Sequence, residues 1–234
     1  MAAMRNETGL NETVMVSGIP NQEFLERYAQ AGRIGLCQGA TLIDKAICRA
    51  QRRLDTEGTA GSWSHVFLFQ GQRADGHHWV IESDLQIHRK HFQFGVQENR
   101  ISKYFDQDLF QSLAVLDFDL NADQVSTMLR EAVALSADRA RYSLRELLGT
   151  LLALRHSRLR SRENLLAREK SMYCSAFVHW VFRKAGLDLA PGLDYKNTTP
   201  KDIARTILPH VAYRLERTAP PRSGHLRRRK VQDK

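Results

Sequence analysis

The 234-residue sequence contains few cysteines and no long apolar run. The number of cysteines is odd, which argues against a disulfide framework, and the three are Cys37, Cys48 and Cys174. Their positions lack the paired spacing of metal ligands, so we do not expect a metal centre either. No stretch approaches the roughly 20 apolar residues that span a bilayer. The first residues are polar and acidic where a secretory signal needs an apolar core. We therefore expect a protein without a metal or other cofactor, located in the cytoplasm or exported without a cleaved signal peptide.

Internal repeats and a regular alternation of strands and helices are also missing. The length fits one domain with a core of ordinary size. Apolar periodicity predicts strands over 63–69, 77–83 and 113–120, and helices over 22–30, 41–52, 122–137, 143–170, 173–185 and 200–208. We expect Asn121 to cap the helix over 122–137, Cys37 to pack at a strand end and Cys48 to pack in the helix over 41–52. Such a mixture is typical of an α+β fold. We expect 1–20 to be a loose N-terminal segment, 21–213 the folded domain, and 214–234 a basic, disordered tail.

Positive charge is in excess, with a formal net charge of +9. Basic residues gather in the segment 155–170, directly after the apolar run 147–154, and again in the tail. A basic cluster beside an apolar helical face can dock on an anionic membrane surface or an acidic partner. A core helix with a solvated basic end would show the same pattern. The tail has no interleaved aromatic residues and no nucleic-acid motif, so we expect no specific nucleic-acid partner.

Cys174 opens the most informative stretch, the predicted helix over 173–185. We expect Ser171 to cap this helix and Gly186 to end it in a left-handed conformation. The apolar residues that share the helix face of the cysteine are Phe177, Val178, Val181 and Ala185. In the first turn, unpaired N–H groups and the helix dipole favour a thiolate, the nucleophilic form. The alternative is a core cysteine without a chemical role.

His65 is the candidate base for this thiol. It lies in the strand predicted over 63–69, and the glycine-bounded polar loop 71–76 connects this strand to the next. If Gln70 pairs with His77, His65 stands directly opposite Glu82 and on the same face of the sheet. The carboxylate can then hold one imidazole nitrogen and leave the other for a thiol, as a nucleophilic cysteine requires. The pair alone could be an ordinary structural contact, but together with Cys174 it favours a catalytic site.

Other polar residues are weaker candidates. His179 follows Cys174 by five places and lies on another side of the helix, so we do not expect it to act as the base. His88 and His91 have no acidic or cysteine partner nearby, which argues against a metal site. Asp75 and Asp84 flank the predicted hairpin, and we expect both to be turn residues.

The sequence resembles the permuted NlpC/P60 enzymes, papain-like cysteine hydrolases of the YiiX/YebB/YaeF type. The resemblance is carried by Ser-His at 64–65 on a strand, Glu82 on the next strand, and a late Tyr-Cys-Ser at 173–175 that opens a helix. It covers roughly 33–208. It implies a circularly permuted papain-like fold with an antiparallel sheet packed against helices. It also implies Cys174 as nucleophile, His65 as general base and Glu82 as the residue that orients the base.

The function implied by the resemblance is hydrolysis of an amide, of the peptide or cell-wall peptide type, through a thioester on Cys174. The same triad would serve a lipid-acyl esterase, a thioesterase or an acyltransferase. The expected partner is accordingly a peptide-like or acyl-lipid substrate. The alternative outside enzymology is a basic binding module in which His65, Glu82 and Cys174 are purely structural.

Overall fold

The computed structural model describes residues 11–51, 63–88, 91–138 and 173–217. The strands are β1 (Glu12–Ser17), β2 (Ile34–Gly39), β3 (His65–Gln72), β4 (His78–His88), β5 (His91–Arg100), β6 (Phe110–Asp117) and β7 (Val211–Glu216). The helices are α1 (Asn21–Tyr28), α2 (Leu42–Gln51), α3 (Ala122–Ala137), α6 (Cys174–Lys184) and α7 (Pro200–Ala204), with the 3-10 turns η2 (Ile101–Tyr104) and η3 (Tyr195–Asn197). None of the helices within the described ranges is both long and apolar enough to cross a membrane.

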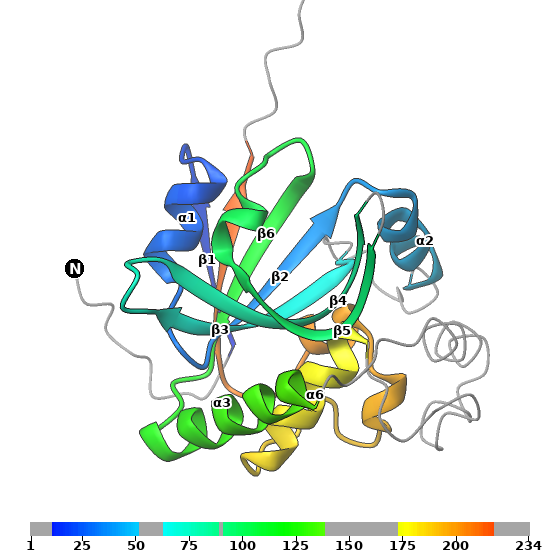
Figure 1. Ribbon diagram of the computed structural model, residues 1–234. Helices are drawn as coiled ribbons and strands as arrows, with labels where there is room; N and C mark the ends of the chain where they lie inside the picture. Colours follow the sequence, from blue (N-terminus) through cyan, green and yellow to red (C-terminus); the bar gives the residue numbers. More distant parts are fainter. Residues whose placement is uncertain (1–10, 52–62, 89–90, 139–172, 218–234) are drawn as a thin grey trace, which may run out of the picture.

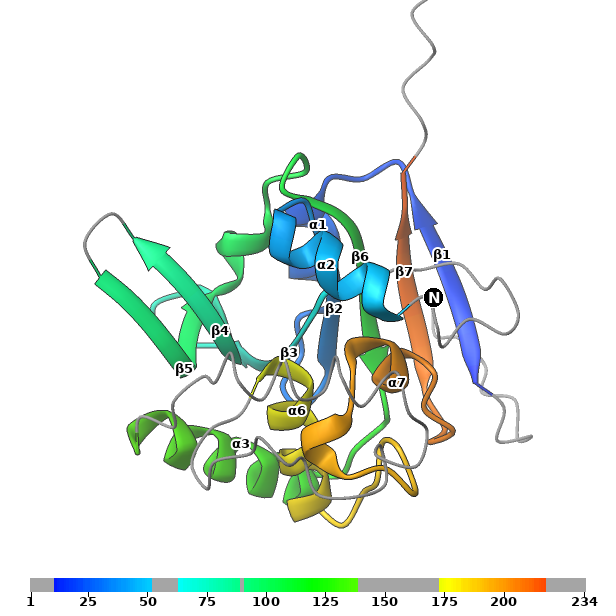
Figure 2. The ribbon, with the colours of Figure 1, turned by 90° about the vertical axis from the view of Figure 1, so that its right-hand side faces the viewer.

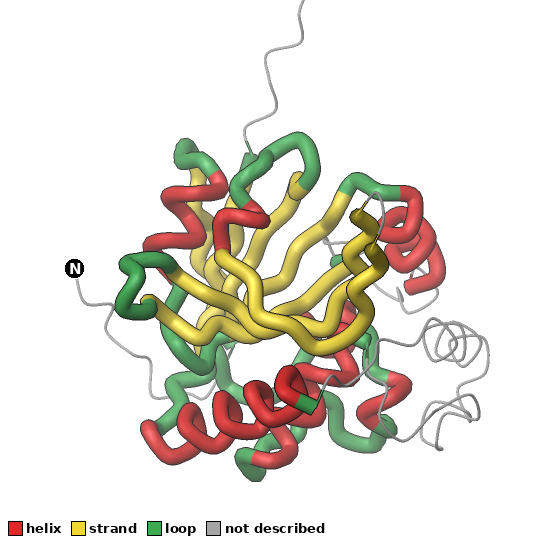
Figure 3. The backbone as a smooth tube through the Cα atoms, in the orientation of Figure 1, coloured by secondary structure: helices red, strands yellow, loops and turns green. Residues whose placement is uncertain are grey.

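A single seven-stranded sheet forms the centre of the molecule, in the order β1-β7-β6-β2-β3-β4-β5 (Figure 1). Neighbouring strands are antiparallel except for the parallel pair of β1 and β7. Helices lie on both sides of the sheet (Figure 3). The predicted α+β class, with a mostly antiparallel sheet packed against helices, is therefore confirmed.

Both faces of the central strands are buried. The side chains of Val66 and Leu68 belong to a core shared with α3 and α6, whereas those of Phe67 and Phe69 belong to a second core beside α1 and η2. All four are fully buried, and each such side chain contributes roughly 1.5–3 kcal/mol through loss of apolar surface from water. Figure 2 shows α3 and α6 on one side, and β4 and β5 curving away from the other strands.

Most of the helix ends that the sequence predicts are present in the structure. Asn121 caps α3 in a capping box with Gln124, as its position before an apolar-periodic segment predicts. Gly186 has φ +79° and ends α6, with its N–H donating to the carbonyl of Arg183 at 3.1 Å. The helix opened by Pro200 is shorter than predicted and ends at residue 204. The helix predicted over 143–170, its basic cluster and most of the tail lie outside the described residues.

The predicted domain boundaries are wrong at both ends of the chain. The segment 1–20, expected to be loose, contains β1, and β7 runs past the predicted boundary at residue 213. These two strands pair in register from Glu12 with Val211 to Ser17 with Glu216. β1 is a mostly exposed edge strand whose partner lies at the other end of the sequence, so no local apolar pattern marks it.

The hairpin of β3 and β4 pairs in a register different from the predicted one. The predicted register places Phe67 opposite Val80, but in the structure Phe69 stands opposite Val80. A bulge next to Gly71, which has φ +91°, accompanies an extension of β3 beyond its predicted end. Because the displacement is an even number of residues, His65 and Glu82 still project from the same face of the sheet.

Candidate active site

Cys174 is the first residue of α6, and Tyr173 is its N-cap residue, so the predicted cap at Ser171 is wrong. The residues on each side of the cysteine anchor the start of the helix. The hydroxyl of Tyr173 donates to the backbone carbonyls of Lys196 and Thr198 at 2.6 and 3.0 Å. The hydroxyl of Ser175 donates to the same Thr198 carbonyl at 2.8 Å. These contacts give the Tyr-Cys-Ser motif a physical role, because they fix the turn that carries the thiol.

The helix that carries Cys174 is buried on nearly every side rather than on one apolar face. Phe177, Val178 and Val181 are fully buried, as predicted, but Ser175 and His179 on other sides of the helix are equally buried. The imidazole of His179 bonds to the Thr198 hydroxyl at 2.7 Å and to Asp188 at 2.8 Å. Burial lowers the pKa of His179. Both ring nitrogens are thus occupied away from the thiol, in agreement with the prediction that His179 is not its base.

His65 is the first residue of β3, and the serine before it locks that position. The backbone N–H of Ser64 donates to the carbonyl of Cys37 at 2.9 Å, and the Ser64 hydroxyl accepts from the N–H of Gly39 at 2.9 Å. Ser64 is fully buried and joins the end of β2 to the start of β3. His65 then pairs with Cys37 across the two strands. The Ser-His dipeptide therefore positions the imidazole at the start of a central strand of the sheet.

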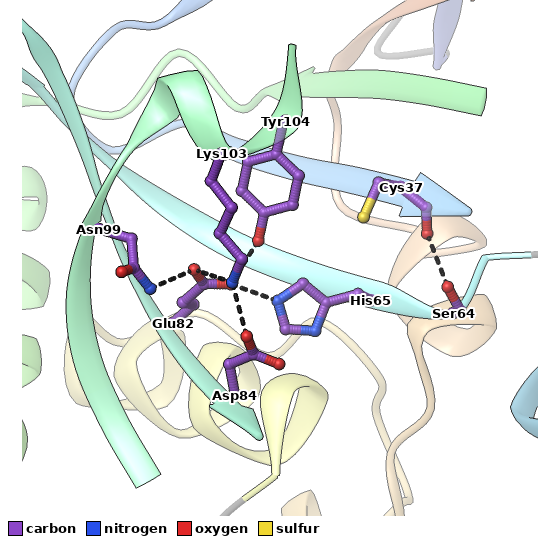
Figure 4. A network of polar contacts seen from close by, with 8 residues as sticks. All are labelled: Cys37, Ser64, His65, Glu82, Asp84, Asn99, Lys103 and Tyr104. Carbon is purple, nitrogen blue, oxygen red and sulfur yellow. Dashed lines mark hydrogen bonds and ion pairs between the residues drawn. The ribbon is translucent and has the colours of Figure 1, made fainter. Parts of the chain in front are cut away.

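The predicted contact between His65 and Glu82 is present. The Nε2 atom of His65 lies 2.5 Å from the Oε2 atom of Glu82 (Figure 4). The imidazole is 14% exposed, whereas the carboxylate is completely buried. The Tyr104 ring stacks beside the imidazole, with 6.4 Å between ring centroids. Although the register differs from the predicted one, the two side chains meet diagonally across neighbouring strands.

Glu82 has three further hydrogen-bond donors, none of which the sequence interpretation identified. Its Oε1 atom accepts from Asn99 Nδ2 and from Lys103 Nζ, each at 2.7 Å. Its Oε2 atom accepts from the hydroxyl of Tyr104. Lys103 also pairs with Asp84, its Nζ atom lying 2.6 Å from Oδ2. Asp84 was predicted to be a turn residue, but it lies within β4, and its carboxylate belongs to this network (Figure 4).

The protonation states follow from these contacts. Burial alone would raise the pKa of Glu82, but the charge of Lys103 and the contacts with His65 hold that pKa far below its usual range. Burial alone would lower the pKa of Lys103, but the two carboxylates raise it above its usual range. Burial and the Glu82 charge raise the pKa of the Tyr104 phenol. At neutral pH the network therefore contains a carboxylate, an ammonium group and a neutral phenol donor.

Cys174 acts on the protonation of His65. Burial alone would lower the pKa of His65, but the charge of Cys174, a side-chain hydrogen bond with it, and the Glu82 carboxylate together raise that pKa well above its usual value. Since Glu82 occupies Nε2, the Nδ1 atom of His65 is left for the sulfur. Cys174 is 6% exposed. The structure thus brings together the three residues that the sequence singled out: Cys174, His65 and Glu82.

The other two thiols lie in the fold as predicted, Cys37 in a strand and Cys48 in a helix, both buried. Burial, followed by the charge of Glu82, raises the pKa of Cys37 well above its usual value. A raised pKa keeps a thiol protonated and poorly nucleophilic. Cys37 therefore lies near the site without the properties of its nucleophile.

The interpretation of this site rests on its geometry. No protein-family model matches the chain, and no curated protein matches it either. Within the described part of the chain, no group of three or more His, Cys, Asp or Glu side chains is placed to hold a metal ion. What the described residues do offer is an imidazole bonded to a buried carboxylate, together with a thiol whose charge acts on that imidazole.

Proposed function

We propose that this protein is a papain-like cysteine hydrolase of the permuted NlpC/P60 type that cleaves an amide bond in a peptide-like substrate. The observation that carries the proposal is the connected series of Cys174, His65 and Glu82. The thiol stands at the first residue of a buried helix, and the imidazole stands at the start of the strand that this helix covers. The histidine strand precedes the cysteine helix in the chain, which is the order expected of a permuted enzyme.

His65 would act as base and then as acid. It takes the thiol proton of Cys174, and the thiolate attacks the substrate carbonyl carbon to form a tetrahedral intermediate. The carbon–nitrogen bond then breaks, and the leaving amine takes the proton from His65, which leaves a thioester on the sulfur. A water molecule, deprotonated by His65, attacks the thioester and releases the carboxylic acid and the free thiol. Glu82 stabilises the imidazolium that forms at each proton transfer.

The start of α6 supplies a donor for the negative oxygen of the tetrahedral intermediate. Cys174 occupies the first helical position, where backbone N–H groups have no partner within the helix. An N–H group fixed next to the reacting sulfur can donate to the developing oxyanion, and such donors are worth about 3–4 kcal/mol of barrier. The hydrogen bonds of Tyr173 and Ser175 hold this N–H in place, since they anchor the residues on each side of it.

Turnover of candidate substrates by variants tests the proposal. The substrates are a peptide library, cell-wall peptides and a series of acyl esters and thioesters. Cys174→Ala and His65→Ala should each abolish turnover with an unchanged circular dichroism spectrum. Cys48→Ala is the matched control, because it removes a buried thiol in α2 outside the triad. We expect it to retain activity.

The outcome also separates the alternatives. Cleavage of esters or thioesters but not amides would assign the same triad to a lipid-acyl esterase, thioesterase or acyltransferase. Turnover by Cys174→Ala equal to that of the native protein would rule out the nucleophile. If the native protein cleaves none of these substrates and its thiol is inert to alkylation, a non-catalytic binding module becomes the better description.

A further inference from the structure

We infer that Lys103 is a positioning residue of this site, because its ammonium group pairs with Glu82 and so lets that carboxylate support the charged form of His65. The inference rests on the proposed function and extends it to a residue that does not touch the reacting atoms. Lys103 acts through Glu82, from which its Nζ atom is 2.7 Å away. A second contact, 2.6 Å to Asp84, holds the ammonium group from the other side.

Two consecutive residues of η2 bind opposite oxygens of the same carboxylate. Lys103 donates to Oε1 of Glu82, and Tyr104 donates to Oε2, the oxygen that also meets His65. Tyr104 is fully buried and anchors the turn, its ring stacked on Phe67 at 4.3 Å between centroids. Because η2 holds the carboxylate at both oxygens, the plane of Glu82 and its direction toward the imidazole are fixed (Figure 4).

The charge of Lys103 has a role that Tyr104 and Asn99 cannot fill. The titratable groups of the network around Glu82 come from five elements: Cys37 of β2, His65 of β3, Asp84 of β4, Lys103 and Tyr104 of η2, and Cys174 of α6. Within this set Lys103 is the permanent cation. Without it, the network would contain the carboxylates of Glu82 and Asp84 and no permanent cation, and neighbouring like charges shielded from water repel each other.

The predicted effect of removing the ammonium group has a definite sign. The pKa of Glu82 would rise, because the group that most lowers it is gone. Glu82 would then become protonated at a higher pH and would stop stabilising the His65 imidazolium. The thiolate that depends on this imidazolium would in turn be lost at a higher pH. In a plot of Cys174 reactivity against pH, the midpoint at which reactivity is lost on the acidic side should therefore lie at a higher pH.

Alkylation by iodoacetamide measures this acidic midpoint and does not require the substrate to be known. The rate of modification of Cys174 is followed by peptide mass spectrometry between pH 3.5 and 8. Lys103→Met should move the acidic midpoint upward by about one pH unit or more, as expected for loss of an adjacent opposite charge. Lys103→Arg, which keeps the charge, should restore most of the shift. Lys184→Met makes the same change at an exposed position of α6, and its profile should match the native one.

Asp84→Asn separates the effect of the Lys103 charge from a general disturbance of the network. It removes the second carboxylate that pairs with Lys103 and keeps the ion pair of Lys103 with Glu82. Its acidic midpoint should stay at the native value or fall. An upward shift as large as that of Lys103→Met would overturn the inference, and so would a Lys103→Met profile that coincides with the native one. Either result would leave the proposed function standing if the native Cys174 is reactive. A native Cys174 that resists alkylation at every pH would instead contradict the proposed function.

Discussion

Replacement of Glu82 by glutamine should be costly, because the carboxylate accepts from four donors in a completely buried position. An amide group has one oxygen and one NH₂. If the oxygen faces His65 and Tyr104, the NH₂ meets the donors of Asn99 and Lys103, and in the other orientation it meets the donors of His65 and Tyr104. Two donors lose their acceptor in either case.

The magnitude follows from those unmatched groups. A buried donor left without an acceptor costs about 1–3 kcal/mol. Breaking a buried ion pair costs about 3–5 kcal/mol, but Lys103 retains Asp84 as a partner. We therefore expect the free energy of unfolding of Glu82→Gln at pH 7 to be lower than that of the native protein by about 3 kcal/mol.

The pH dependence of this difference is also predicted. The pKa of folded Glu82 lies far below its unfolded value of about 4.3, so its contribution to stability is present above that pH and is lost as the pH falls. At pH 3.5 the difference between native protein and variant should have shrunk by about 1 kcal/mol. Urea unfolding followed by circular dichroism at both pH values measures it.

Glu98→Gln is the matched control. Glu98 lies on β5 and pairs with Arg73, but its side chain is 33% exposed. Exposed ion pairs contribute about 0.2–1 kcal/mol, so this variant should lose no more than about 1 kcal/mol. A loss for Glu82→Gln no larger than that of Glu98→Gln, or a loss independent of pH, would refute the reasoning.

Three further predictions concern the thiols, the helix start and the basic segment. At neutral pH iodoacetamide should label Cys174 well before Cys37, whose pKa is raised by burial, and equal labelling of the two in a peptide map would contradict this. Tyr173→Phe removes the buried hydroxyl that bonds to the carbonyls of Lys196 and Thr198, of which Thr198 keeps the Ser175 hydroxyl, and it should lower the free energy of unfolding by about 1–3 kcal/mol in urea titrations. Tyr28→Phe, which removes a hydroxyl from a half-buried ring, should lower it by less than about 0.5 kcal/mol, and similar losses in both would argue against the anchoring role. If the basic cluster 155–170 docks on anionic membranes, sedimentation with acidic vesicles should fall steeply with salt, whereas equally weak binding to acidic and neutral vesicles at low salt would exclude it.

Local patterns in the sequence were sufficient for most helices and for the residues of the candidate site. The helix over 122–137 and its cap at Asn121 were predicted because both signals lie within a few residues of each other. The contact of His65 with Glu82 was predicted although the register was wrong, since side chains on neighbouring strands keep their face when the pairing moves by two residues. Cys174 was placed at a helix start by the apolar periodicity that follows it.

Only the tertiary structure could reveal the groups that surround the triad. Asn99 and Lys103 reach Glu82 because β5 pairs with β4 and η2 follows it, and no periodicity in either segment indicates a carboxylate partner. The pairing of β1 with β7 joins segments from opposite ends of the chain, which local propensity cannot anticipate. The sequence alone therefore determined which residues could react, because reactivity belongs to the residue type and its local element. The protonation and orientation of those residues depend on charges and donors that only folding brings within about 3 Å.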